Sequence, residues 1–322
     1  MGTDEPLITI LMAVYHPRLD WLIEQLDSLN SQTYPHLELI VCDDGPDVPT
    51  DERVFEEHIT SFPWRMIRNE ENLGSNRSFE KLTALAEGDY FAYCDQDDVW
   101  LPEKLTLLRE DLERERAELV CSDMSIIDGE GQVIADSITK VRRHHVFHSG
   151  EGLASGLLLS NFASGCTMLI RAETAKNALP FCPYMVHDQY LALVSAVYGR
   201  IYSDPRPLIN YRVHGGNQTG LMAGVHSRED YLELRILEIR KRLEWLSSNL
   251  PCRDLEMDRE IGKRLKWLLA REQRMQFRRG GAGTIWKYRR FGPRAALFEL
   301  FAPFLPERAF LFAAELARQN KL

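Results

Sequence analysis

Short apolar runs alternate with amphipathic helical segments through the first 125 residues, and this alternation restricts the fold more than any other feature. The apolar runs have the length and composition of buried strands and lie at 7–15, 37–45, 64–69, 89–95 and 117–124. The segments between them place apolar residues three or four positions apart, as a helix requires. Strands joined by helices form right-handed βαβ units, so the sequence predicts an α/β fold with a mostly parallel central sheet flanked by helices.

The rest of the chain predicts an extension of this domain followed by a helical region. From about 126 to 215 the pieces are shorter and mixed, which fits a continuation of the same domain, and we place its end at residue 225. Residues 226–322 are expected to form a helical C-terminal extension. Its clearest helical signal is an apolar stripe made by Leu232, Ile236, Ile239, Leu243 and Leu246.

Composition excludes several classes of protein. The formal net charge of −9 over 322 residues opposes binding to nucleic acid, which needs a surplus of Lys and Arg. No apolar run is long enough to span a membrane, and the N-terminus does not resemble a secretory signal. None of the six cysteines lies in a C-x-x-C pair, so reduced core thiols in a cytoplasmic protein are expected.

A basic segment near the C-terminus stands out in this acidic chain. Between 274 and 294 there are seven Lys and Arg residues and no acidic residue, and an aromatic-rich amphipathic stretch follows. Such a segment can lie on an anionic membrane, here the inner face of the cell membrane. The alternative is a helix that docks on the protein itself.

Polar side chains follow three of the predicted strands and should meet at one edge of the sheet. They are Tyr15-His16, Asp43-Asp44 and the group from Asp95 to Asp98. Ligands of open α/β sheets bind at this edge, beyond the carboxyl ends of the strands. Closely spaced carboxylates can hold Mg²⁺ or Mn²⁺, with diphosphate oxygens and water completing the shell. An ordinary acidic turn is the alternative.

Seven motifs, in order over residues 7–220, resemble family 2 glycosyltransferases of the GT-A fold, and bacterial rhamnosyltransferase-type members in particular. They are ILMAVYHP, VCDDG, NEENLGSNRSF, AEGDYFAYCDQDDVWLPEKL, SGCTMLI, HDQYLALVSAVYG and YRVHGGNQTG. The resemblance implies a nucleotide-diphospho-sugar transferase fold and an inverting transfer of a sugar, with rhamnose as one candidate. The implied acceptor is a hydroxyl of a cell-surface polysaccharide or a lipid-linked glycan.

The resemblance also assigns roles to residues on the donor side. Tyr15 matches a tyrosine that stacks on the nucleotide base, and one of Asp43 and Asp44 matches the acid that binds the base. His16 stands where the family usually has Asn, which leaves its role open. The residues implied in nucleotide or donor binding are Ala13, Tyr15, Asp43, Asp44, Asn72, Gly74, Arg77, Asp95, Gln96, Trp100 and Arg212.

The remaining assignments concern the metal and the acceptor. The resemblance implies Asp97 and His214 as metal ligands for Mn²⁺ or Mg²⁺, and it places Asp98, Gly165 and His187 on the acceptor or sugar side. Asp188 matches the catalytic base, which an inverting transfer needs because an acceptor hydroxyl does not ionise near pH 7. Asp188 can alternatively be a helix cap, and Asp43-Asp44 can form a turn with Gly45.

Two other functions remain open at this stage. A sugar nucleotidyltransferase also uses paired carboxylates, but it needs a Gly-rich, basic N-terminal loop that LMAVYHPRLDW lacks. A catalytically inactive nucleotide-sugar-binding module would keep the fold and lose some of the chemistry. The joint presence of Asp95, Asp97, Asp188 and His214 opposes this second alternative.

Overall fold

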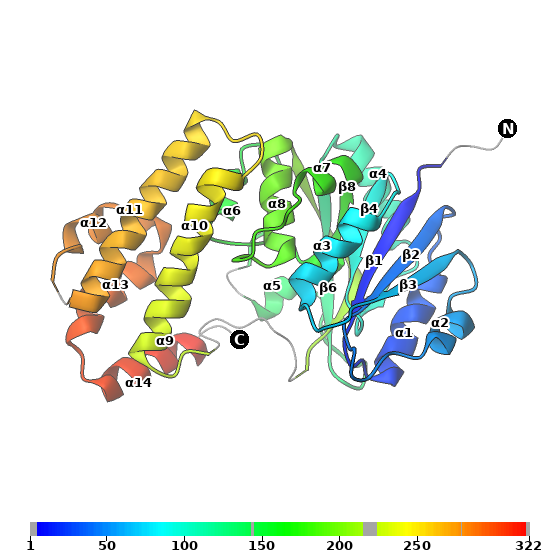
Figure 1. The fold of residues 1–322 in the computed structure, drawn as a ribbon, viewed down its shortest axis with the longest axis horizontal. Coiled ribbons are helices and arrows are strands. Elements are labelled where there is room, and N and C mark those ends of the chain that lie inside the picture. Colours follow the sequence, from blue (N-terminus) through cyan, green and yellow to red (C-terminus); the bar gives the residue numbers. More distant parts are fainter. Residues whose placement is uncertain (1–4, 143–144, 215–223, 278, 320–322) are drawn as a thin grey trace. The chain divides into compact units, whose positions relative to one another are not determined.

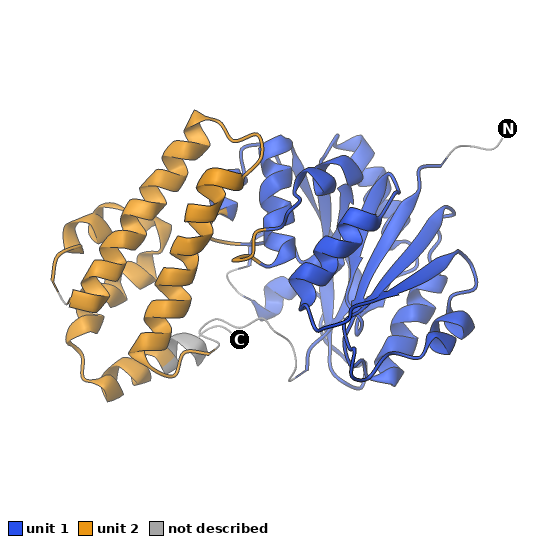
Figure 2. Cartoon of the chain, viewed as in Figure 1, with its two compact units in different colours: residues 1–157, 161–181, 186–216 blue, residues 158–160, 182–185, 217–322 orange. Residues whose placement is uncertain are grey.

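The computed structural model describes residues 5–142, 145–214, 224–277 and 279–319, with side chains up to residue 314. The chain forms two compact units (Figure 2). Unit 1 comprises residues 1–157, 161–181 and 186–216, and unit 2 comprises 158–160, 182–185 and 217–322. None of the described helices is both long enough and apolar enough to cross a membrane.

Unit 1 is built on a single nine-stranded sheet. Its strands are β1 (Ile8–Val14), β2 (Leu37–Asp43), β3 (Trp64–Arg68), β4 (Tyr90–Cys94), β5 (Val99–Trp100), β6 (Leu119–Ile127), β7 (Val133–Ala135), β8 (Met168–Arg171) and β9 (Ile201–Arg212). Its helices are α1 (Leu19–Asn30), α2 (Glu52–His58), α3 (Ser75–Leu85), α4 (Lys104–Arg114), α5 (Ile138–Val141), α6 (Ala154–Leu157), α7 (Ala172–Asn177) and α8 (His187–Tyr198), with a 3₁₀ turn, η1, at Gly165–Thr167.

The strand order is β3-β2-β1-β4-β8-β6-β9-β5, with β7 paired to β6. The first four strands of this order are parallel, as the sequence predicts. Beyond β4 the sheet is mixed, because β8 enters antiparallel to both β4 and β6. Strand β6 then pairs parallel with β9, and β5 pairs antiparallel with β9. The predicted, mostly parallel sheet is therefore a mixed one, with a block of four parallel strands in its N-terminal half and a further parallel pair at β6 and β9.

Helices cover both faces of this sheet (Figure 1), and the alternation of side chains along each strand explains how. Ile8, Ile10 and Met12 belong to one apolar cluster with buried residues of α1, α2 and α4. The intervening residues point to the opposite face, where Phe79 of α3 and His187 of α8 pack on Tyr93. Both faces are buried, which is why the strands read as continuous apolar runs.

Unit 2 is helical. It contains α9 (Arg228–Leu232), a π-helical turn (Glu233–Leu237), α10 (Glu238–Asn249), α11 (Leu255–Phe277), α12 (Ala282–Lys287), α13 (Pro293–Phe301) and α14 (Glu307–Gln319), with 3₁₀ turns at Arg289–Phe291 (η3) and Ala302–Phe304 (η4). Ile236, Leu243 and Leu246 of the predicted stripe are buried. A buried ion pair joins Arg271 of α11 to Glu299 of α13, and the Tyr231 hydroxyl donates to Glu299 at 2.8 Å. This pair ties α9, α11 and α13 together.

Candidate active site

The acidic segment begins where β4 ends, at the carboxyl edge of the parallel strands. Asp95 and Asp97 are partly buried there, and Asp98 is fully buried. Gln96 joins this segment to the end of β1, since its Oε1 accepts from the Tyr15 N–H at 2.7 Å and its Nε2 donates to the Tyr15 carbonyl at 3.1 Å. The structure thus brings the first and fourth strand ends together, as the sequence predicts.

Crowding makes the carboxylates of this segment hard to ionise together. Burial, reinforced by the charges of Asp97 and Asp188, raises the pKa of Asp95 to about 7. Burial also raises the pKa of Asp98 well above its ordinary value. Ligand atoms of Asp95, Asp98 and Cys166 lie within 4.8 Å of one another. A bound cation would relieve this repulsion.

A second pair at the same edge joins Asp97 to His214. The His214 Nε2 and the Asp97 Oδ2 are 2.6 Å apart, and both side chains are partly accessible. His214 follows β9 and its ring lies 4.9 Å from that of Trp21 in α1. The resemblance implies Asp97 and His214 as metal ligands. Although they are 117 positions apart in the sequence, they lie in direct contact in the structure.

Lys104 was missed at the sequence level and lies directly behind this cluster. It is fully buried, its Nζ donates to the Cys166 carbonyl at 2.5 Å, and it lies 3.1 Å from the centroid of the Trp100 ring. Burial lowers its pKa to about 7. In the sequence it looks like any charged residue at a helix start, and only the depth of burial distinguishes it.

Two of the expected donor-side residues are core residues instead. Trp100 is only 1% exposed because β5 pairs with β9 and turns its indole onto Lys104. Arg212 is also buried, and its guanidinium pairs with Glu24 and donates to the Asp97 carbonyl at 2.9 Å. Asp98 accepts from the Arg212 N–H at 3.0 Å. Trp100, Arg212 and Asp98 support the acidic loop from inside the fold. Direct contact of Trp100 or Arg212 with a donor stays a prediction, and their burial does not favour it.

Asp43 and Asp44 organise the loops after β2 and β3. Asp43 accepts from the Gly45 and Thr50 N–H groups and pairs with Arg68 at 2.8 Å. Asp44 accepts from the Asn69 amide at 2.7 Å and from the N–H groups of Leu73 and Gly74, both at 2.8 Å. Both carboxylates are buried and hydrogen-bonded.

The remaining donor-side residues border this edge. Ala13 is partly buried near the end of β1, and Tyr15 beyond it is exposed, with its ring stacked on that of His16 at 4.0 Å. Asn72 donates to the Asp44 carbonyl, and Gly74 precedes α3 with a φ of +78°, a conformation that favours glycine. Arg77, in the first turn of α3, is exposed.

Asp188 lies in the first turn of α8, held by three hydrogen bonds. Its carboxylate accepts from the Gly165 N–H at 3.2 Å, the Gln189 N–H at 2.5 Å and the Asn161 amide at 3.1 Å. Burial raises its pKa to about 6, and its charge acts on Asp95. A carboxylate with this pKa is ionised at neutral pH and still basic enough to accept a proton. Asn161 carried no signal in the sequence.

His187 and Gly165 pack closely behind Asp188. The His187 ring lies 4.2 Å from Phe79 and 5.5 Å from Tyr93, and burial lowers its pKa to about 3, so it is neutral. A Cβ added to Gly165 would lie 2.6 Å from the His187 Nε2. The glycine is therefore required for space, and His187 acts as a packing partner of the turn that holds Asp188.

We expect Gly165→Ala to lower activity strongly, because its methyl group would collide with His187 and displace the N–H that binds Asp188. Overpacking of this kind costs about 1–3 kcal/mol of stability. Gly156→Ala is the matched control, since nothing lies within 4 Å of a Cβ there. Turnover and thermal unfolding of both variants check this, and equal turnover in the two would contradict it.

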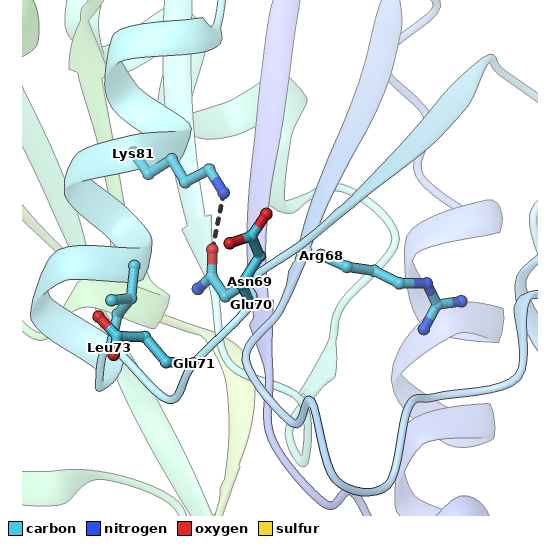
Figure 3. Close-up of a pocket in the computed structure, with 6 residues that line it drawn as sticks. All are labelled: Arg68, Asn69, Glu70, Glu71, Leu73 and Lys81. Atoms are coloured by element: carbon cyan, nitrogen blue, oxygen red, sulfur yellow. Dashed lines mark hydrogen bonds between the residues drawn. The ribbon is translucent and has the colours of Figure 1, made fainter.

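A cavity of about 620 Å³ lies beside the loop after β3 (Figure 3). The Lys81 Nζ donates to the Asn69 Oδ1 at 2.7 Å, while the Arg68 guanidinium turns away toward Asp43 and Glu52. The cavity is lined by Arg68, Asn69, Glu70, Glu71, Leu73 and Lys81. Arg68 is paired with carboxylates and Lys81 is hydrogen-bonded to an amide, and no residue of the acidic cluster lines the cavity. The cavity therefore borders the Asp44 side of the site but does not contain the proposed catalytic or metal-binding residues.

Comparison with known proteins decides the family. The profile of glycosyl transferase family 2 matches residues 9–176, more than half of the chain. The chain belongs to glycosyl transferase family 2. This membership decides against the nucleotidyltransferase alternative. The matched region includes the acidic segment, Lys104 and Gly165, but it ends before Asp188 and His214.

Two relatives agree with this membership. An uncharacterized glycosyltransferase of Methanocaldococcus jannaschii, MJ1057, is 30% identical over 41% of this chain and 47% of its own length, so the chain spans about half of that relative. The Escherichia coli UDP-Glc:alpha-D-GlcNAc-diphosphoundecaprenol beta-1,3-glucosyltransferase WfgD is 25% identical over 59% of this chain and 70% of its own.

A solved structure extends the likeness across nearly the whole chain. Staphylococcus aureus TarS 1-349 in complex with UDP-GlcNAc has a TM-score of 0.58 at 18% identity, and the match covers 97% of this chain and 88% of that one. This likeness concerns the fold, and it confirms the predicted GT-A fold with a helical C-terminal region.

Proposed function

We propose that this family 2 glycosyltransferase is an inverting, metal-dependent enzyme that moves a sugar from a nucleotide diphosphate to a hydroxyl of a cell-envelope glycan. The observation that carries the proposal is Asp188, a carboxylate held by the Gly165 N–H and the Asn161 amide beside the acidic cluster. Within the proposed catalytic domain, residues 1–225, the nucleotide would lie along the edge formed by Tyr15, Asp43-Asp44 and Asp95.

The acidic edge fits a divalent cation. Asp97 and His214 offer one carboxylate and one imidazole in a partly accessible position, and the carboxylate suits Mn²⁺ or Mg²⁺ with phosphate and water completing the shell. Cys166 is a poor ligand for such hard cations, and burial raises the pKa of its thiol well above the ordinary value. We therefore assign the cation to Asp97 and His214, with Asp95 beside it. A cation bound there would neutralise charge on the departing diphosphate.

The protein's own groups perform the proton transfer. Asp188 would accept the proton of the acceptor hydroxyl. As it does so, the hydroxyl oxygen attacks the anomeric carbon and the bond from that carbon to the diphosphate breaks. General-base catalysis by such a carboxylate contributes about 10²–10⁴-fold. The hydrogen bonds from Gly165 and Asn161 fix the carboxylate, so little motion is needed before reaction.

A donor screen tests the proposal directly. UDP-glucose, UDP-GlcNAc and dTDP-rhamnose are mixed with the protein and Mn²⁺, and the unfolding temperature and release of nucleotide diphosphate are measured. A true donor stabilises the folded state by mass action, because it binds only the folded protein. We expect one donor to stabilise strongly and to be turned over. Stabilisation by a donor without any transfer to lipid-linked acceptors would favour the inactive binding module.

The acceptor is proposed to be lipid-linked and used at the inner face of the membrane, with the protein in the cytoplasm. WfgD, by its name, acts on a diphosphoundecaprenol-linked sugar. In unit 2, Arg294, Leu297 and Phe301 follow one another at helical spacing along α13 and are exposed. Exposed Trp286, Phe304 and Phe312 lie on neighbouring elements with Lys287, Arg289 and Arg290. Exposed aromatic residues with adjacent cations suit an anionic bilayer surface.

Point substitutions test this membrane contact better than truncation. Deletion of 278–322 would also remove Glu299, the buried partner of Arg271, and so would destabilise unit 2. We expect Leu297→Ser with Phe301→Ser to reduce co-sedimentation with phosphatidylglycerol-containing vesicles and to leave soluble-substrate turnover intact. Val133→Ser with Ile134→Ser, also exposed and apolar, is the control. Equal sedimentation of both double variants would contradict the proposal.

A further inference from the structure

The first residue of α4 is a lysine with no exposed surface. Lys104 is buried completely, although a buried ammonium loses its hydration and a cation at a helix N-terminus meets the positive end of the helix dipole. An apolar side chain of similar volume would cost less stability at such a position. The contacts of Lys104 indicate what role the side chain has that offsets this cost in stability.

Two hydrogen bonds, joined through the backbone of Gly165 and Cys166, connect Lys104 to Asp188. The Lys104 Nζ donates to the Cys166 carbonyl at 2.5 Å, and Cys166 lies in the η1 turn next to Gly165. The Gly165 N–H then donates to the Asp188 carboxylate at 3.2 Å. The Trp100 ring, 3.1 Å from Nζ, covers the ammonium and restricts its movement.

Lys104 and the acidic cluster also act on each other electrostatically. Asp95 and Asp98 lie with the Cys166 thiol in a group whose ligand atoms are within 4.8 Å of one another. The charge of Lys104 acts on Asp95 against the repulsion from Asp97 and Asp188. Lys104 therefore contacts the η1 turn that binds Asp188, and in its protonated form it offsets charge at the neighbouring carboxylates.

We propose that Lys104 is a positioning residue that holds the η1 turn, and through it Asp188, in the geometry needed for proton transfer. The proposal rests on the proposed role of Asp188. Because Lys104 contacts the Cys166 carbonyl directly, its effect on the η1 turn can be measured without any turnover.

The test compares Lys104→Met with Lys104→Gln by amide hydrogen exchange and kinetics. The methionine fills the space but cannot donate, whereas the glutamine amide can donate to the Cys166 carbonyl. In Lys104→Met we expect faster exchange in the peptide containing Gly165 and a kcat about 10–100-fold lower, the range found when a group that orients a metal ligand is removed. The donor KM should change much less, and Lys104→Gln should recover most of both effects.

Leu108→Ala is the matched control, because Leu108 lies on the same helix and is equally buried. It should lower the unfolding temperature without faster exchange at Gly165. The proposal is overturned if Lys104→Met behaves as Leu108→Ala does, or if Lys104→Gln is no better than Lys104→Met. If Lys104→Met does not fold, near-wild-type exchange and kcat in Lys104→Gln support the proposal, and large losses in both overturn it. Faster exchange at Gly165 in Lys104→Met, together with no sugar transfer by the wild-type protein, would support the positioning role of Lys104 and count against the proposed function.

Discussion

Asp188→Asn is expected to lower kcat by about 10²–10⁴-fold while donor binding changes little. The asparagine keeps an oxygen that can accept from the Gly165 or Gln189 N–H, so the turn should persist. It cannot take a proton from the acceptor hydroxyl, so only the chemical step is affected. Titration with the nucleotide donor and Mn²⁺, together with initial rates of transfer, measures the two effects separately.

Asp51→Asn is a suitable control for this variant. Asp51 also stands at a helix N-terminus, that of α2, where its side chain accepts from the Arg53 N–H at 3.1 Å. Its replacement should affect stability slightly and kcat hardly at all. A kcat for Asp188→Asn within about tenfold of wild type would refute the base assignment.

The pH dependence of kcat gives a second measure of the same group. Burial raises the pKa of Asp188 to about 6, so the ionised, active form is lost as the pH falls through 6. We expect kcat to fall on the acid side with an apparent pKa near 6. An acid limb near pH 4, the ordinary range of an aspartate, would show that the catalytic base is in a different environment.

The sequence predicted the elements of unit 1 better than their order. Strands were expected at 7–15 and 89–95 and are found at Ile8–Val14 and Tyr90–Cys94, because apolar runs report burial directly. The antiparallel entry of β8 between β4 and β6 could not be predicted, since pairing partners leave no mark in local composition.

The same limit applies to the site. Carboxylates at strand ends were predictable, because the edge of a parallel sheet gathers them. Whether a polar residue faces outward or inward was not predictable, since this depends on packing by distant segments. Trp100 and Arg212 therefore turned out buried, and Lys104 and Asn161 gained roles only through contacts with residues 27 or more positions away.

Replacement of Asp97 should have the second large effect, on binding and not on proton transfer. We expect Asp97→Asn to weaken Mn²⁺-dependent donor binding by at least about 100-fold, since even outer-shell partners of a metal contribute 10–100-fold. The asparagine can still hydrogen-bond to His214, whose Nε2 lies 2.6 Å from the Asp97 carboxylate, so the local fold should persist. Titration of nucleotide and Mn²⁺ into the variant, with Mn²⁺ spectroscopy, measures the change.

Asp27→Asn provides a matched control, because the Asp27 carboxylate pairs with the His58 Nδ1 at 2.7 Å on the surface of α1 and α2. It reproduces the loss of one carboxylate beside a histidine without touching the acidic cluster, so Mn²⁺ affinity should be unchanged. Tight nucleotide binding by the wild-type protein without any divalent cation would exclude the metal assignment. Loss of Mn²⁺ affinity in Asp95→Asn but not in Asp97→Asn would identify Asp95 as the metal ligand in place of Asp97. Removal of a carboxylate charge weakens metal binding strongly only where that carboxylate binds the ion.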